Sequence, residues 1–312
     1  MSDLAQNLSA YPAISKVVDR LLTDWPEHGR YIESRFKDDT PDFLARTEEF
    51  AALALTGMQD DLQLYCADYR WMCEEFWKEE FHFRREGSYR LSTFEEAYRE
   101  VYSNADYMSR YVRGILISQI IWDPHARAFD IFRTQFLTGI GEGASYLEVG
   151  PGHGFFLAFA SREADLGRME AWDVSPSSIA EAKQALNRLG VTREITIVEQ
   201  DVLAAPARHD EFDAAVISEV LEHLERPDLA LQSLHAALKP GGRIFINAPI
   251  NSPAPDHIYL WRSPSEFSDF VKAQGFEIQE AYDLPQTGVK LERALKLDMS
   301  VSCIVIGRKP GT

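Results

Sequence analysis

The spacing of hydrophobic residues divides the chain into two halves. Up to about residue 138, apolar residues recur at the three-to-four-residue spacing of amphipathic helices. From residue 144 onward, short apolar stretches alternate with amphipathic ones, which is the pattern of strands alternating with helices. We therefore predict an all-helical N-terminal domain, residues 1–138, followed by an α/β domain, residues 139–312.

Helix-start signals support the helical reading of the first half. Thr40-Pro41 places a capping residue before a proline in the first turn, and Pro124 is expected to open another helix. Ser92, with Glu95 three residues later, predicts a capping box.

Seven apolar stretches in the second half predict strands. Five of them alternate with helices, which predicts a doubly wound, Rossmann-like parallel sheet. These five are residues 145–149, 169–174, 195–198, 214–217 and 244–248. The last two, 276–282 and 299–307, are joined by too short a segment for a full crossover helix. We therefore predict a hairpin at the end of the sheet.

A glycine-rich turn follows the first predicted strand. It reads Glu148-x-Gly150-x-Gly152-x-Gly154, and glycines allow a backbone to approach a ligand closely. The helix that follows offers free N–H groups to an anionic group of that ligand. Dinucleotide-binding folds use G-x-G-x-x-G instead, and Phe155 stands where their third glycine would be. The turn thus disfavours an NAD-dependent oxidoreductase.

Acidic residues also end the later strands. Asp173 lies nineteen residues after Gly154, near the spacing at which a carboxylate accepts the two hydroxyl groups of a ribose. Asp201 follows the third strand, and the fourth delivers Ser218 and Glu219 to the carboxyl edge of the sheet. Ligands of α/β sheets bind at this edge.

These elements together resemble the class I S-adenosylmethionine-dependent methyltransferases. The glycine turn, the two aspartates, the run 221–224 (Leu-Glu-His-Leu) and the turn 238–242 (Leu-Lys-Pro-Gly-Gly) occur in the order typical of that family. The last two are typical of the small-molecule subgroup that includes the ubiquinone-pathway enzymes. The resemblance covers about residues 107–307. It implies S-adenosyl-L-methionine as cofactor and a seven-stranded sheet with an antiparallel terminal hairpin.

The resemblance also implies residue roles. Glu148 supports the methionine end of the cofactor, beside the glycine turn. Asp173 binds the ribose, and Val174 packs against the adenine. Asp201 accepts a hydrogen bond from the adenine amino group, while the backbone N–H of Val202 reaches a ring nitrogen.

Aromatic residues just upstream of the glycine turn often close over the cofactor in this family. Tyr107 and Tyr111 are the matching positions, and Arg110 or Arg113 is a candidate partner for the cofactor carboxylate. The cofactor site is completed by the sheet-edge pair Ser218 and Glu219.

Three residues are candidates for catalysis. His257, in the loop after the fifth strand, is the preferred general base, because a neutral imidazole accepts a proton near physiological pH. It fits a packing role in this loop equally well. Tyr259 is expected to orient the substrate, and His223 is a second base for which a structural role is favoured. We predict no metal, because Asp256 and His257 are neighbours, and adjacent residues rarely form a site unaided.

Composition narrows the partners. The net charge of −17 and the pI near 4.9 disfavour nucleic-acid and anionic membrane surfaces. The three cysteines, an odd number without Cys-x-x-Cys, argue against disulfides and a zinc site. The N-terminus lacks the features of a signal peptide, and no apolar run approaches the length of a membrane span. We expect a cytoplasmic protein.

The predicted function is methyl transfer to an oxygen, nitrogen or carbon atom of a small apolar or aromatic metabolite. Aromatic residues concentrated between positions 71 and 94 belong to a helical core or, for a few of them, to the substrate pocket. The helical half either covers that pocket or forms a homodimer. A protein or RNA methyltransferase and a non-catalytic interaction protein of the same fold stay open as alternatives.

Overall fold

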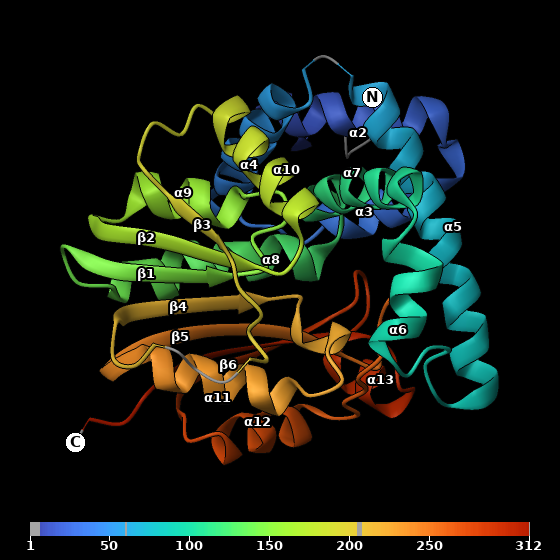
Figure 1. Ribbon diagram of the computed structural model, residues 1–312. Helices are drawn as coiled ribbons and strands as arrows, with labels where there is room; N and C mark the ends of the chain where they lie inside the picture. Colours follow the sequence, from blue (N-terminus) through green and yellow to red (C-terminus); the bar gives the residue numbers. More distant parts are fainter. Residues whose placement is uncertain (1–6, 60, 205–207, 312) are drawn as a thin grey trace.

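The computed structural model describes residues 7–59, 61–204 and 208–311. Its centre is a seven-stranded sheet with the order β3-β2-β1-β4-β5-β7-β6, flanked by helices (Figure 1). Only β7 runs antiparallel to its neighbours β5 and β6. The strands are β1 (Ala144–Val149), β2 (Leu166–Asp173), β3 (Thr196–Glu199), β4 (Phe212–Ser218), β5 (Leu238–Ile250), β6 (Glu277–Pro285) and β7 (Val301–Arg308).

The predicted fold class is confirmed. Each of the seven apolar stretches coincides with a strand, and the last two pair as an antiparallel hairpin at the sheet edge. Strand β5 is longer than predicted, because it begins at Leu238 and includes the Lys-Pro-Gly-Gly segment. The strand order reverses between β1 and β4, so the ends of these two strands flank the crevice where such sheets bind ligands.

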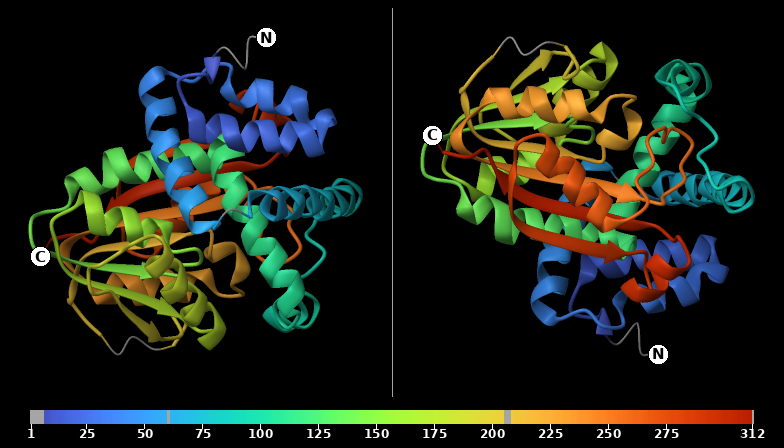
Figure 2. Two further views of the ribbon diagram at one scale, coloured as in Figure 1. Left: turned by 90° about the horizontal axis from the view of Figure 1, so that it is seen from above. Right: turned by 90° about the horizontal axis from the view of Figure 1, so that it is seen from below.

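Helices cover both faces of the sheet (Figure 2). Side chains alternate along each strand, so Tyr146 and Phe245 belong to one hydrophobic core, whereas Leu147 and Ile246 belong to the other. The first core includes α8 (Asp123–Ile131), α9 (Phe155–Glu163) and α10 (Pro176–Arg188). The second includes α11 (Pro227–Ala237), α12 (Pro264–Ala273) and α13 (Leu291–Lys296).

The N-terminal helices share the first of these cores. Phe132, in the π-helical segment η3 (Phe132–Phe136), packs against Phe156 at 4.5 Å and against Phe245 of β5 at 5.6 Å, both between ring centroids. The helices before it are α2 (Pro12–Asp24), α3 (Gly29–Phe36), α4 (Pro41–Gly57), α5 (Leu62–Glu86), α6 (Phe94–Ala97) and α7 (Ala105–Ile121). The division into domains 1–138 and 139–312 stays a prediction.

Most predicted helix starts are confirmed. The Thr40 side chain accepts from the backbone N–H of Phe43, and Pro124 lies in the first turn of α8. The capping box was predicted one residue too early, because it is formed by Thr93 and Glu96. The Glu96 carboxylate accepts from the backbone N–H groups of both Ser92 and Thr93, at 3.1 and 3.2 Å. Ser92 therefore lies just outside the helix.

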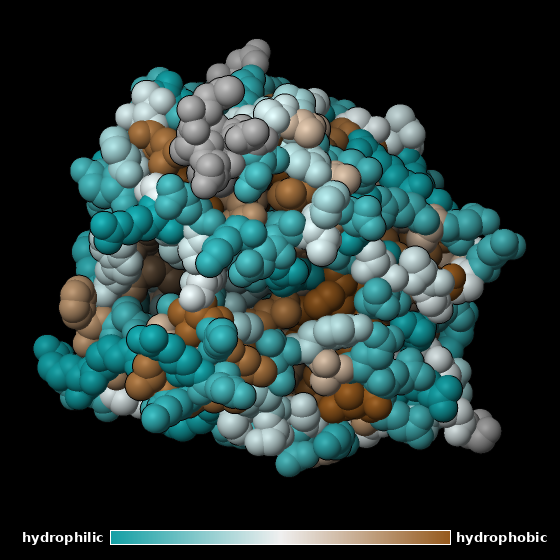
Figure 3. Space-filling view, turned by 180° about the vertical axis from the view of Figure 1, so that it is seen from behind, coloured by the Kyte–Doolittle hydropathy of each residue, from teal (hydrophilic) through white to brown (hydrophobic). Residues whose placement is uncertain are grey.

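Seen from behind, the surface is mostly hydrophilic, and hydrophobic residues gather in hollows across its middle (Figure 3). Cys66, Cys73 and Cys303 are buried free thiols, as predicted. In the described part of the chain, no helix combines the length and the apolar character needed to cross a membrane.

Truncating Phe132 tests whether helices and sheet share one core. Phe132 is 0% exposed, so Phe132→Ala should lower the free energy of unfolding by about 3–5 kcal/mol in urea titration. Phe81→Ala, at a side chain that is 78% exposed, is the control and should change it by less than about 0.5 kcal/mol. A small effect of Phe132→Ala would contradict the shared core.

Candidate functional site

A cavity of about 330 Å³ lies at the carboxyl edge of the sheet. Its floor is formed by the ends of β1 and β4 and by the glycine turn. Its roof is formed by side chains of the helical half, among them Phe76 of α5, Ile115 of α7 and Trp122 before α8. Residues from both halves of the chain therefore enclose one space.

The glycine turn has the backbone that its sequence requires. Gly150, Gly152 and Gly154 have φ angles of +68°, +47° and +75°. Residues with a Cβ atom rarely adopt such positive values, whereas glycine does so readily. Gly150 and Gly152 line the cavity. A Cβ at Gly154 would meet Leu186 of α10 at 3.3 Å, so this glycine also makes room for a neighbouring helix.

Glu148 lies beside this turn as a buried acid. Its side chain lines the cavity, and the Tyr146 hydroxyl donates to Glu148 Oε2 at 3.0 Å. Burial raises the pKa of Glu148 to about 8. The carboxyl group is therefore largely protonated at neutral pH without a ligand, and a cationic ligand would favour its ionised form.

Asp173 ends β2 and also lines the cavity. Its Oδ1 accepts from the backbone N–H of Ser175 at 2.9 Å, which fixes the carboxylate at the start of α10. Desolvation raises the pKa of Asp173 above its usual value, even though backbone N–H groups oppose this shift.

The predicted adenine contacts lie outside the cavity lining. Val174 is 54% exposed. Asp201 accepts from the backbone N–H of Leu203 at 2.8 Å, and Val202 is buried in the second core. The adenine roles of these three residues stay predictions.

Ser218 and Glu219 lie where predicted, at the end of β4 and in the lining of the cavity. The Asn247 side-chain amide donates to Ser218 Oγ at 3.1 Å and to Glu219 Oε1 at 2.9 Å. Glu219 has a φ of +53°, and its backbone N–H donates to Asn247 O. Such strained backbone is concentrated at functional sites. Burial raises the pKa of Glu219 to about 7.

Only one of the two upstream tyrosines lines the cavity. Tyr111 is buried, and its hydroxyl donates to Asp256 Oδ1 at 3.1 Å. Tyr107 packs edge-on against Trp71, with ring centroids 4.7 Å apart, outside the lining. The suggested arginines both bind Asp68, from Arg110 Nε at 2.9 Å and from Arg113 Nε at 2.6 Å. Asp68 therefore competes with any cofactor carboxylate for both groups.

The two histidines meet over the cavity, with ring centroids 4.9 Å apart. His257 Nδ1 lies 2.6 Å from the carbonyl oxygen of Ser252. Burial, and then the neighbouring His223, lower the pKa of His257 to about 4. His257 is thus uncharged at neutral pH, and its use as a general base stays a prediction.

Tyr259 does not line the cavity. Its ring packs against Trp261 and Phe270 in the second core, with centroids 4.5 and 6.0 Å away. Its proposed contact with the substrate stays a prediction.

The sequence analysis assigned no role to Tyr102 or Glu222, and it considered Asp256 only as a metal ligand beside His257. The Tyr102 hydroxyl donates to Asp256 Oδ2 at 3.0 Å, and Glu222 is 0% exposed. The spacing of Glu219 and Glu222, three positions apart across a tight turn, was the signal that could have found one of them. The sequence contains no such signal for Tyr102, because this residue lies more than 100 positions from its partners.

The lining of the cavity is acidic. Among the described residues that form it, none is a lysine or an arginine. The acids are Glu148, Asp173, Glu219, Glu222 and Asp256. Such a cavity favours a cationic ligand over a phosphate-bearing one.

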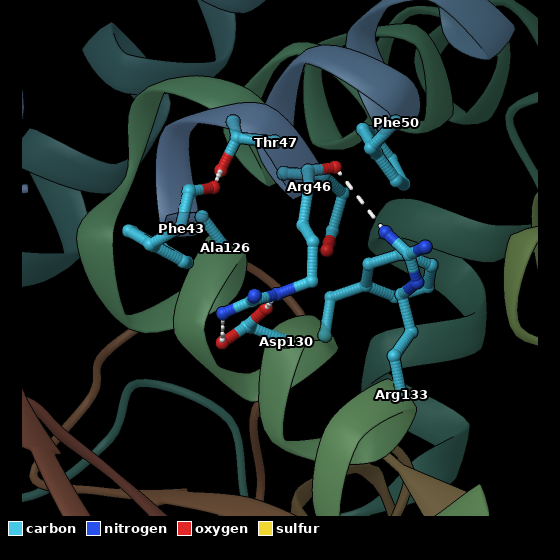
Figure 4. A pocket seen from close by; sticks show the side chains of 9 residues that line it. Phe43, Arg46, Thr47, Phe50, Ala126, Asp130 and Arg133 are labelled. Carbon is cyan, nitrogen blue, oxygen red and sulfur yellow. Dashed lines mark hydrogen bonds and ion pairs between the residues drawn. The ribbon is translucent and has the colours of Figure 1, made fainter. Parts of the chain in front are cut away.

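A much smaller crevice of about 10 Å³ lies between α4 and α8 (Figure 4). The Arg46 guanidinium binds Asp130 across it, with Arg46 Nη2 3.1 Å from Asp130 Oδ2. Arg133 Nη1 donates to the carbonyl oxygen of Arg46 at 3.3 Å. This crevice is too small for a cofactor.

Comparison with known proteins agrees with the fold. A family model described as "Methyltransferase domain" matches residues 147–246, which include the glycine turn, Asp173 and the sheet edge. This part of the chain is therefore similar to a methyltransferase domain, and it belongs to the seven-stranded sheet. The resemblance read from the motifs is confirmed. The cofactor of this class is S-adenosyl-L-methionine.

Relatives with a similar sequence include ubiquinone/menaquinone biosynthesis C-methyltransferases. The enzyme of Haemophilus ducreyi is 30% identical over 148 residues, which are 46% of this chain and 56% of the relative. That of an Enterobacter species is 29% identical over 120 residues, which are 37% and 48%. The match thus spans about half the length of these relatives.

Solved structures of similar fold include a cyclase and an N-methyltransferase. The [4+2]-cyclase SpnF has a TM-score of 0.49 and 19% identity, over 60% of this chain and 81% of its own. The N-methyltransferase NodS from Bradyrhizobium japonicum has a TM-score of 0.48 and 18% identity, over 70% and 100%.

The protonation of Glu148 predicts how stability depends on pH. Because its folded pKa of about 8 exceeds the unfolded value of 4.5, the folded state binds the proton more tightly, and stability falls as pH rises from 4.5 to 8. Glu148→Gln removes this loss and should stabilise the ligand-free protein by on the order of 2 kcal/mol at pH 8.

The measurement is urea unfolding of both proteins between pH 5 and 8.5. The gain from Glu148→Gln should be small at pH 5 and grow with pH. Glu142→Gln, at an exposed acid just before β1, is the control. An equal gain at all pH values would contradict a buried, protonated Glu148.

Proposed function

We propose that this chain transfers the methyl group of S-adenosyl-L-methionine to a small apolar or aromatic molecule. The observation that carries the proposal is the single cavity that joins the glycine turn and Asp173 to an apolar roof from the helical half. A methyl donor bound on the floor would face an acceptor held under the roof.

The residues of the floor fit the cofactor in shape and charge. A Cβ at Gly152 would meet one backbone oxygen 4.0 Å away, so this position faces open space. At neutral pH the cofactor carries one carboxylate, one ammonium and one sulfonium group, for a net charge of about +1. The acidic lining suits such a cation and disfavours NAD, whose pyrophosphate is anionic.

Each group on the floor has a distinct role in this proposal. Asp173 accepts the ribose hydroxyl groups, while the N–H groups at the start of α9 receive the carboxylate. Glu148 and Glu219 lie close enough to the cavity to stabilise positive charge. The cofactor, when bound, supplies both the methyl group and its leaving group. Positioning of the acceptor then provides much of the rate enhancement.

The roof supports a small acceptor with apolar surface. Phe76, Ile115 and Trp122 offer ring faces and aliphatic groups, and Tyr102 and Tyr111 add hydroxyl groups near the polar end. The names of the relatives specify methyl transfer to carbon in quinone biosynthesis, which makes an aromatic carbon one candidate acceptor. The homodimer role of the helical half stays a prediction.

The acidic lining also weighs against an RNA acceptor. The cavity holds five acidic side chains and, among the described residues, no cationic one to meet a phosphate. A labelled methyl group should therefore be transferred to small aromatic and quinone-like acceptors, and not to RNA or protein. Transfer to RNA or protein alone would contradict the proposal, and the absence of transfer to any acceptor would favour an interaction protein.

Asp173→Ala tests the placement of the ribose. The loss of two hydrogen bonds to a charged carboxylate, together about 2–3 kcal/mol, should weaken binding of S-adenosylhomocysteine by about 30-fold or more in calorimetry. Asp269→Ala, at an exposed acid of α12, is the control. Unchanged affinity of Asp173→Ala would refute the placement, and a wild-type protein that binds neither form of the cofactor would refute the proposed function.

A further inference from the structure

Three side chains beside the cavity converge in a way that the methyl-transfer proposal does not use. Glu222 and His223 belong to the short helix η5 (Leu221–His223), and His257 belongs to the loop after β5. One ligand atom from each lies within 4.8 Å of the others. In the described ranges of the chain, no other group of three His, Cys, Asp or Glu residues converges in this way.

In each of the two histidines, Nδ1 faces a backbone carbonyl oxygen and Nε2 lies near the Glu222 carboxylate. His257 Nδ1 faces Ser252 O at 2.6 Å, and His223 Nδ1 faces Asp256 O at 3.1 Å. A carbonyl oxygen only accepts, so each Nδ1 carries a proton, and in the neutral form of each ring Nε2 keeps its lone pair. Histidines that bind metals are held in this way, by a hydrogen bond from the other ring nitrogen.

Both lone pairs lie near one carboxylate. His223 Nε2 is 3.7 Å and His257 Nε2 is 4.0 Å from Glu222 Oε1. Metal–ligand bonds of about 2.0–2.1 Å at tetrahedral angles would separate the ligand atoms by roughly 3.3 Å. The two nitrogen–oxygen pairs would have to close by about 0.4 and 0.7 Å. The three ligand atoms, which lie within 4.8 Å of one another, would have to close by at most about 1.5 Å to enter the coordination sphere of one ion.

Glu222 supplies the second, independent observation. It is 0% exposed, and neither carboxylate oxygen has a hydrogen-bond partner among the described residues. Buried polar groups without partners are rare and costly. The carboxyl group of Glu219, which also lines the cavity, lies beside that of Glu222. Two adjacent acids of this kind require either a shared proton or a cation.

The surroundings resemble the outer shell of a metal site. Asp256 Oδ2 lies 3.4 Å from His223 Nδ1, and it also accepts from the Tyr102 hydroxyl. Its other oxygen, Oδ1, accepts from Tyr111. A carboxylate held by two hydroxyl groups behind a histidine fixes the orientation of the ring and strengthens it as a ligand.

From this arrangement we infer that Glu222, His223 and His257 bind a divalent first-row transition-metal ion, such as Zn²⁺. Two imidazole nitrogens and one carboxylate oxygen suit such ions, whereas Mg²⁺ and Ca²⁺ prefer oxygen ligands alone. Three protein ligands leave at least one coordination position open. All three residues line the cavity, so that position faces the space where small molecules bind.

This inference revises the expectation of no metal. The sequence offered only the neighbours Asp256 and His257, and the structure gives them different tasks. His257 is a ligand, while Asp256 holds His223 from behind. Glu222, which was not considered, supplies the carboxylate. The inference does not depend on the identity of the methyl donor.

The test is metal binding by the full-length, tag-free protein after treatment with a chelator. We expect one equivalent of Zn²⁺ in calorimetry, and visible absorption bands of Co²⁺ bound at low coordination number. Glu222→Gln and His257→Ala should each weaken Zn²⁺ binding by about 100-fold or more. His235→Ala, at a histidine of α11 outside the cavity, is the matched control and should bind as the wild type does.

Glu222→Gln also separates a lost ligand from a lost fold, because it keeps the size of the side chain and removes a buried charge. Its metal-free form should be at least as heat-stable as the wild type, and Zn²⁺ should raise the melting temperature of the wild type only. Binding of S-adenosylhomocysteine by Glu222→Gln, and of Zn²⁺ by Asp173→Ala, should persist. Absence of Zn²⁺ and Co²⁺ binding, or equal binding by wild type and Glu222→Gln, would leave a shared proton as the explanation and overturn the inference.

Discussion

The burial of carboxyl groups at the carboxyl edge of the sheet is the constraint on which the rest of the structure depends. Five acids line one cavity, and among the described residues of its lining no lysine or arginine balances them. An isolated buried carboxylate is costly, so each must be hydrogen-bonded, protonated or matched by a ligand. Glu148 has Tyr146, Glu219 has Asn247 and Asp256 has two tyrosines. Asp173 accepts from the backbone N–H of Ser175, whereas Glu222 has no such partner among the described residues.

The helical half increases the cost of burying these carboxyl groups. The sheet edge of an α/β domain is ordinarily open to water, which would hydrate these acids. Here the helices cover it, and they share a continuous hydrophobic core with one face of the sheet. The same helices that exclude water supply the apolar roof of the cavity. Low polarity strengthens every electrostatic interaction with a ligand inside, and it also raises the cost of leaving the cavity empty.

Much of the fold could be predicted from the sequence, because its signals are local. Strand positions follow from short apolar runs, and the helix starts at Thr40 and Pro124 follow from cap chemistry. Even the error at Ser92 was local, since Thr93 offers the same hydroxyl one position later. The cavity-lining residues Gly150, Asp173 and Glu219 were found because the ends of parallel strands meet at one edge.

The polar end of the site could not be predicted, because its contacts cross the chain. Tyr102 meets His223 across 121 positions, and Tyr111 meets Asp256 across 145. Tyr259 shows the converse, since a residue two positions from His257 turns to the opposite core. The alternation of a strand does not continue into a loop, so proximity in sequence says little there.

The difference between strand ends and loops also explains how one edge of the sheet can hold both the proposed cofactor site and the proposed metal site. The floor is built by residues at strand ends, whose places follow from the sheet itself. The polar end is built by the loop after β5 together with residues from helices. The carbonyl oxygens of Ser252 and Asp256, both in this loop, accept hydrogen bonds from Nδ1 of the two histidines. Because these backbone groups hold the rings from behind, both free nitrogens must face Glu222. Two imidazole rings beside an unpaired acid form a good set of metal ligands.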